Sequence, residues 1–169
     1  MDDPIVNRVQ ESGLIQVDLS SLLEPRPVDS IDVAQWLDNG FILREKPFRD
    51  AVAQWDASPL AHHVVALVCT TDAILPDWAW MLVAAKLRSL GCTAIVGTLG
   101  EAKALAWREA VHSLDLDAYK DERVIVKGCA SVGGPSTLVT FTNHVGPVVR
   151  SLMFGEACSA VPLVKNSRP

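Results

Sequence analysis

Three cysteines follow apolar runs that have the length and composition of buried β-strands. Cys69 ends the run VVALVC, Cys129 comes three residues after RVIV, and Cys158 comes four residues after SLMF. Thiolates bind zinc and iron–sulfur clusters well, and a thiol whose pKa is lowered is a nucleophile. The carboxyl ends of parallel strands meet at one edge of a sheet, where ligands usually bind. The sequence therefore predicts that these three thiols converge on a site.

The chain has four cysteines, and the fourth serves as an internal contrast. Cys92 precedes the run TAIV, so it belongs at the opposite edge of such a sheet. No CxxC pair occurs, which argues against a zinc finger. Free cysteine is also among the most buried residue types, so plain core packing stays open as an alternative for each thiol.

A metal site built on three thiolates needs a fourth ligand. Asp72 follows Cys69 by three residues, and Glu156 precedes Cys158 by two, so either carboxylate is a candidate. Solvent or an exogenous ligand is the alternative. This ligand set suits a zinc ion or an iron–sulfur cluster. The histidines are poorer candidates, because each lies before a strand or within a helix.

The segment GCASVGGPS suggests a different chemistry, in which Cys129 is a nucleophile or a persulfide carrier. The segment runs from a strand into the start of a helix, so its backbone amides are suited to holding an anion and lowering the pKa of the thiol. The candidate anion-binding loop comprises Gly128, Ser131, Gly133, Gly134 and Ser136. The glycines equally suit a plain strand-to-helix turn.

Known nucleotide and phosphatase motifs are absent from this segment. A P-loop requires Lys where Gly134 stands, and a phosphatase-type cysteine loop requires an Arg, yet none occurs before Arg150. No G-x-G-x-x-G is present either. The sequence thus predicts no nucleotide cofactor, and whether the protein is an enzyme stays open.

From residue 61 onward, strand and helix patterns alternate, which is typical of parallel strands joined by helical crossovers. This pattern predicts a small three-layer α/β domain with a mostly parallel sheet, of the Rossmann or flavodoxin type. Residues 61–169 would form the core, and residues 1–60 would cover one edge of the same domain. The predicted strands are 62–69, 93–97, 123–128, 150–154 and a short edge at 161–165; the predicted helices are 77–90, 100–114 and one capped by Ser136 that ends at Gly146.

Residues 1–60 carry weaker signals. Residues 14–23 suit a strand or a short helix, Asp32 can cap a helical turn through VAQWL, and residues 46–55 form an amphipathic helix pattern. Trp36 and Trp55 are predicted to pack in the core.

The predicted helix 77–90 is apolar on nearly all sides, with charge concentrated near its end. Such a helix must be buried on several sides. Either the N-terminal segment or a second subunit covers it, and the second alternative predicts a homodimer. A third hypothesis for function follows: a non-catalytic protein-interaction module whose cysteines are buried and structural.

Composition excludes several partners. The 169 residues suit one domain, 49% are apolar, 21% are charged, and the formal net charge is −5. Nothing in this charge favours nucleic acid or an anionic membrane. No apolar run approaches the ~20 residues that span a bilayer, and MDDPIVNRVQ lacks the basic start of a signal peptide. The expected location is the cytoplasm, where thiols stay reduced.

Several segments resemble the bacterial family known as domain of unknown function 2480. They are IVNRVQESGLIQVDL, NGFILREKPFR, CTTDAILPDWAWMLVA, VIVKGCASVGGPS and SLMFGEACSAVPLVK. The resemblance implies a link to sulfur mobilisation and iron–sulfur cluster assembly, with assembly proteins as partners, and it carries over no catalytic residues. The leading hypothesis is an accessory protein of iron–sulfur or sulfur metabolism that binds a metal ion or cluster through Cys69, Cys129 and Cys158.

Overall fold

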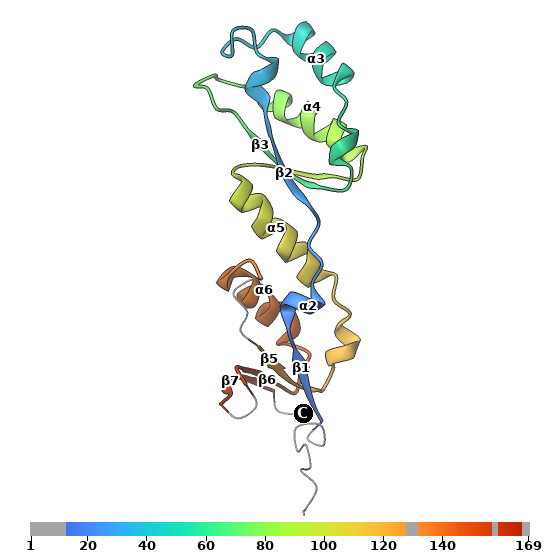
Figure 1. Ribbon diagram of the computed structural model, residues 1–169, viewed down its shortest axis with the longest axis vertical. Coiled ribbons are helices and arrows are strands. Elements are labelled where there is room, and N and C mark those ends of the chain that lie inside the picture. Colours follow the sequence, from blue (N-terminus) through green and yellow to red (C-terminus); the bar gives the residue numbers. More distant parts are fainter. Residues whose placement is uncertain (1–12, 128–131, 157–158, 167–169) are drawn as a thin grey trace, which may run out of the picture. The chain divides into compact units, whose positions relative to one another are not determined.

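The computed structural model of the chain describes residues 13–127, 132–156 and 159–166, and within these ranges the fold is mixed α/β. The chain divides into two compact units (Figure 1). The central unit comprises Pro25–Ala106, and the terminal unit combines Met1–Glu24 with Trp107–Pro169. Four of the five strand pairings are parallel, so the predicted α/β class with mostly parallel strands is confirmed.

The central unit contains a three-stranded parallel sheet in the order β2-β3-β4. Its strands are β2 (Val28–Asp32), β3 (Val64–Val68) and β4 (Thr93–Val96). Two crossovers connect them. The first contains η1 (Val33–Trp36), α3 (Glu45–Gln54) and η2 (Ser58–Leu60), and the second contains α4 (Asp77–Arg88).

The strand β3 is apolar throughout because both faces of the sheet are covered. Val65 and Leu67 belong to one buried cluster, together with residues of α3 and α4. Val64 and Ala66 belong to a second cluster on the other face. That cluster includes Ala102 and Ala106 of α5 (Leu99–His112), whose small side chains allow the helix to approach closely.

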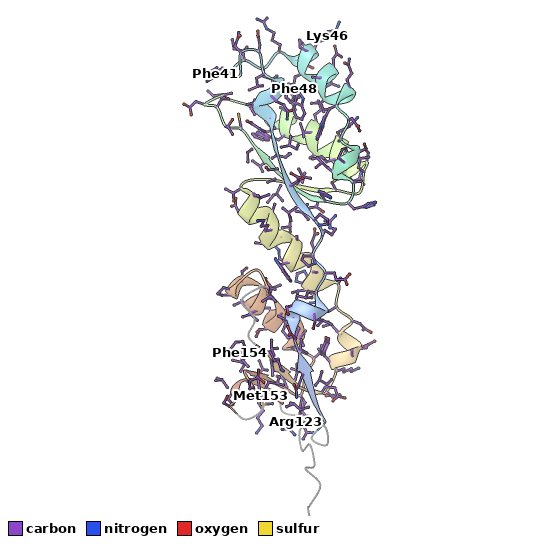
Figure 2. All side chains as sticks on the ribbon, viewed as in Figure 1. Phe41, Lys46, Phe48, Arg123, Met153 and Phe154 are labelled. Atoms are coloured by element: carbon purple, nitrogen blue, oxygen red, sulfur yellow. The ribbon has the colours of Figure 1, made fainter. Side chains whose placement is uncertain are left out.

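One side of the helix α4, formed by Ala79, Val83 and Leu87, is buried in the central unit. The ring of Phe48, on α3, lies 5.8 Å from the ring of Trp78 on α4 and is itself fully buried (Figure 2). Trp36 packs against Phe48 at 6.0 Å and against Trp55 at 5.1 Å, which confirms the core packing predicted for both tryptophans. This packing covers one side of α4, whereas Met81 on the same helix is 69% exposed, so the homodimer stays a prediction.

The terminal unit contains a four-stranded sheet in the order β1-β5-β6-β7. Its first three strands, β1 (Leu14–Val17), β5 (Arg123–Val126) and β6 (Ser151–Phe154), are mutually parallel. The edge strand β7 (Val161–Lys165) is antiparallel to β6, with a bulge between Leu152 and Met153. The helical segments of this unit are α2 (Leu19–Leu22), η3 (Leu116–Tyr119), α6 (Pro135–Val145) and the end of α5 from Trp107 onward, which supplies Ala110 and Val111 to the core.

One face of this sheet packs against α6 and η3 to form the core of the unit (Figure 1). Val124, Val126 and Leu152 of the strands are buried against Phe141 of α6. The ring of Tyr119 meets that of Phe141 edge-on, with their centroids 6.3 Å apart.

The structure divides the chain differently from the predicted covering segment 1–60 and core 61–169. Residues before 60 contribute β1 to the terminal sheet and β2 to the central sheet, so they are integral to both units. The strands also form two sheets instead of one. The pairing of β1 with β5 joins segments more than a hundred residues apart, and such pairing leaves no local pattern in the sequence.

Candidate functional site

The three strands that precede the predicted site cysteines belong to two different sheets. Cys69 follows β3 of the central unit, whereas Cys129 and Cys158 follow β5 and β6 of the terminal unit. Cys129 and Cys158 themselves lie outside the described residues. The strands before Cys129 and Cys158 therefore share one sheet, whereas the strand before Cys69 belongs to the other.

Neighbouring strands lead to Cys129 and Cys158. The parallel ladder between β5 and β6 ends with Val126 opposite Phe154, and the Gly155 amide continues it by donating to the Val126 carbonyl at 2.9 Å. Adjacent strands lie about 4.8 Å apart. The chain thus leaves the sheet at two neighbouring points, three residues before Cys129 and four before Cys158.

Charged residues flank the same edge of the terminal sheet. Lys127, which follows β5, has its Nζ 3.8 Å from the Glu156 Oε2 after β6. Asp18, which follows β1, accepts hydrogen bonds from the Ser20 hydroxyl at 2.6 Å and the Ser20 amide at 2.9 Å. These bonds hold the pKa of Asp18 below its ordinary value, and the charge of Lys127 lowers it further.

Lys127, after β5, thus lies close to two carboxylates: that of Asp18 after β1 and that of Glu156 after β6. Glu156 was predicted at this edge, whereas Lys127 and Asp18 were not. The signal that would have found them is simple, since each directly follows a strand of the same sheet.

Two glycines of the predicted anion-binding loop adopt a left-handed backbone before α6. Gly133 has φ +72° and Gly134 has φ +81°. A Cβ on Gly133 would stand 2.5 Å from Cδ1 of Trp107, so this position also requires glycine for close packing. Gly128 and Ser131 lie outside the described residues, so an anion nest in this loop stays a prediction.

The predicted cap at Ser136 is wrong by two residues. Gly134 is the N-cap of α6, and Pro135 occupies the first helical turn. The fixed φ of proline and its missing N–H suit that first position, so the helix begins before Ser136. Ser136 instead lies within the helix, where its carbonyl accepts a bond from the Thr140 hydroxyl at 2.9 Å.

Cys69 is tied into its own turn. Its half-buried thiol donates to the Thr71 carbonyl at 3.4 Å and packs against the central-unit core. Cys92 precedes β4, as predicted, and its buried thiol donates to the Leu60 carbonyl at 2.9 Å. Both described thiols therefore have the contacts of structural cysteines.

Asp32 joins the ends of β2 and β3 next to Cys69. Its Oδ1 accepts the Ala34 amide at 2.9 Å, which confirms the predicted cap, and also the Thr70 amide at 3.2 Å. Its Oδ2 accepts the Thr70 hydroxyl. The Thr70 hydroxyl is the main cause of a lowered pKa for Asp32, against an opposing effect of burial. At the carboxyl ends of β2 and β3, hydrogen bonds within the central unit thus hold the backbone in place.

The candidate ligand Asp72 is exposed. Within residues 13–127, 132–156 and 159–166, no group of three or more His, Cys, Asp or Glu side chains lies close enough together to hold a metal ion. Because Cys129 and Cys158 are not among those residues, the predicted ligand set is untested by this geometry.

The family model described as "Protein of unknown function (DUF2480)" matches residues 3–166 of the chain. The chain belongs to the DUF2480 family. The match spans both units and all four cysteines, so the two-unit organisation falls within a single family domain. No curated protein and no solved structure matches the chain. In the described part of this DUF2480 chain, no helix is both long and apolar enough to cross a membrane.

The histidines of this DUF2480 chain lie away from the strand ends that precede the cysteines. His63 comes just before β3, with its Nδ1 3.9 Å from Asp29 Oδ2. His112 of α5 and His144 of α6 have ring centroids 5.0 Å apart. Sequence analysis placed these two residues on separate helices and missed their contact, because it depends on how the helices pack.

Proposed function

We propose that this DUF2480 protein is an accessory protein of iron–sulfur or sulfur metabolism that binds a metal ion or cluster through Cys129 and Cys158. The observation that supports the proposal is the pairing of β5 with β6, which ends at Val126 and Phe154. The strands that lead to the two thiols are parallel neighbours, and sheet edges of this kind commonly hold ligands.

Glu156 is the third ligand in this proposal. It precedes Cys158 by two residues, and its carboxylate lies at the same edge. Two thiolates and one carboxylate leave a coordination position open to solvent or to a ligand from another protein. An open position distinguishes a reactive or transferring site from a closed structural one. This arrangement therefore suits a protein that passes a metal or cluster to a partner.

The partners and location follow from the chemistry and the family resemblance. We propose iron–sulfur assembly proteins as partners and the cytoplasm as the location, because reduced thiols persist there. Cys69 and Asp72 belong to a wider, three-thiol form of the proposal. The Cys69→Ser variant tests this form.

The test is the metal and sulfide content of protein purified without oxygen. We expect bound zinc or iron in the wild type and loss of it in Cys129→Ser and in Cys158→Ser. Cys92→Ser is the matched control and should retain the metal. Retention in Cys69→Ser supports the two-thiol form, and loss supports the three-thiol form. Wild-type protein without metal, even after reconstitution, would overturn both forms.

A second function, thiol chemistry at Cys129, is favoured by Lys127. This cation precedes Cys129 by two residues, and a nearby ammonium lowers the pKa of a thiol. We expect Cys129 to alkylate fastest among the four thiols near neutral pH, as measured by mass spectrometry of iodoacetamide adducts. Lys127→Gln should slow that reaction, whereas Lys103→Gln, which changes a lysine of the central unit, should not. Equal slow rates at all four cysteines would count against a nucleophile or persulfide carrier.

A further inference from the structure

The face of the terminal sheet that points away from the core carries cations. Side chains alternate between the two faces of a strand. Val124 and Leu152 face the buried core, so their neighbours Arg123, Ser151 and Met153 project from the opposite face. Figure 2 labels Arg123 at the start of β5 and Met153 on β6.

Arg123 and Ser151 form one row across the sheet with Lys165 of β7. Arg123 pairs with Ser151, and Ser151 pairs with Lys165. Because neighbouring strands lie about 5 Å apart, the Cα atoms of Arg123 and Lys165 are about 10 Å apart, and Ser151 lies between them. Two long cationic side chains at this separation can both reach one carboxylate or phosphate group.

A pocket of about 360 Å³ lies over this row. Its lining adds Arg150, which precedes β6, and the apolar side chains of Met153 and Pro162. The volume is within the range of sites for small molecules. Among the described lining residues there is no carboxylate to neutralise the cations.

Hydrogen bonds hold the backbone that carries two of the cations of the pocket. Asn166 donates its side-chain amide to the Gly146 carbonyl at 2.9 Å and the Val149 carbonyl at 2.7 Å, and its backbone amide donates to the Arg150 carbonyl at 3.0 Å. These bonds fix the chain that carries Lys165 and Arg150. Within the described ranges, none of the three cations of the pocket forms an ion pair.

Protection of the sheet edge does not explain this cluster. Lysine and proline on an edge strand prevent sheets from pairing with one another, which accounts for Lys165 and Pro162 on β7. Arg123, however, lies on β5, an interior strand between β1 and β6. Like charges that converge on a pocket repel one another, and a bound anion would relieve that repulsion.

We propose that this pocket binds a small organic anion that carries two or more carboxylate or phosphate groups. The planar guanidinium groups of Arg123 and Arg150 contact those groups, because they match carboxylate and phosphate geometry. Met153 and Pro162 contact the apolar part of the ligand. Arg123 and Ser151 begin β5 and β6, whereas Cys129 and Cys158 follow their ends, so this site is separate from the proposed thiol site.

The test is calorimetric titration of the full-length protein with two probes, tricarballylate and 2,3-bisphosphoglycerate, at constant ionic strength. We expect saturable one-to-one binding of at least one probe. Arg123→Gln and Arg150→Gln should each weaken it at least about tenfold, because each removes charge-assisted hydrogen bonds. Thermal unfolding of each variant should match the wild type, since both side chains are exposed.

Arg108→Gln is the matched control, because Arg108 is an exposed cation of the same unit outside the pocket lining. Its affinity for the probes should equal that of the wild type. Absence of saturable binding with both probes would overturn the proposal. So would pocket variants that bind as tightly as the wild type, or a control that weakens binding as much as they do. Titration of the Cys129→Ser/Cys158→Ser double variant should give wild-type affinity, whatever the outcome at the thiol site.

Discussion

The hydroxyl of Thr70, just beyond the end of β3, donates to the carboxylate of Asp32 at the end of β2, with 2.5 Å between the two oxygens. The same carboxylate accepts the backbone amides of Thr70 and Ala34. One side chain therefore caps η1 and also links two neighbouring strands. This relationship places the Cys69 turn and makes its stability depend on an ionised Asp32.

Replacing Asp32 should destabilise the central unit. Asp32→Ala removes an N-cap and leaves the Thr70 amide without its acceptor, so we expect a loss of about 1–2 kcal/mol in the free energy of unfolding. Urea denaturation measures it. Asp50→Ala, at an exposed position of α3, should change stability by less than about 0.5 kcal/mol. Equal effects of the two substitutions would contradict the role of the Asp32 carboxylate.

Acid should weaken the same link. The pKa of Asp32 is lowered in the folded state from its ordinary value of 3.8. Its ionised form thus contributes stability that is complete above pH 3.8 and is lost as the pH falls through the folded pKa. The difference in unfolding free energy between wild type and Asp32→Asn should therefore shrink in that acidic range. A difference that is constant with pH would argue against the ionised link.

Phe48 should be among the residues most important to the central unit. It is fully buried and contacts Trp36 and Trp78 edge-on. Phe48→Ala should lower the free energy of unfolding by about 3–5 kcal/mol, as is usual for a large cavity in a core. Phe41 is 59% exposed, so Phe41→Ala should cost less than about 1 kcal/mol. Comparable losses for the two phenylalanines, measured by urea denaturation, would contradict the described core.

Gly133 should tolerate no side chain. Its φ of +72° strains any L-residue, and an added Cβ would meet the Trp107 ring at 2.5 Å. We expect Gly133→Ala to cost at least about 2 kcal/mol. Gly13, with φ +60° and open space around it, is the matched control, and its alanine variant should cost only about 1 kcal/mol. Thermal unfolding of both variants, with tryptophan fluorescence as the probe, distinguishes the clash from backbone strain alone.

Tyr119 is the single tyrosine of the chain, so its ionisation is directly observable by ultraviolet absorbance. Burial, with a smaller effect of Asp115, raises its pKa above the ordinary value of 10.0. The stability that the neutral phenol contributes is complete below pH 10.0 and is lost as the pH rises through the folded pKa. We expect the phenol to titrate at higher pH in folded protein than in urea. Asp115→Asn should leave most of this shift, because burial is its larger cause. Identical titrations in the folded and unfolded states would contradict the described burial.

Much of the local structure follows from the sequence alone. The continuous apolar run at 64–68 is β3, the alanine-rich segment beginning near residue 100 is α5, and Asp32 caps η1. The α/β class, the mostly parallel pairing and the family were predicted from such patterns and are confirmed. The individual strands, helices and caps depend on residues close together in the chain, where periodicity, capping and propensity act. The parallel direction of the strands was predicted from their alternation with helices.

Only the tertiary structure decided which strands share a sheet, and therefore which cysteines share an edge. The sequence indicated that Cys69, Cys129 and Cys158 each follow a strand, and nothing in it assigned β3 to one sheet and β5 and β6 to another. The row of Arg123, Ser151 and Lys165 was equally hidden, because three distant segments supply it. Parallel pairing is specified by how buried faces pack between segments far apart in the chain, so the local sequence carries no sign of the partner strand.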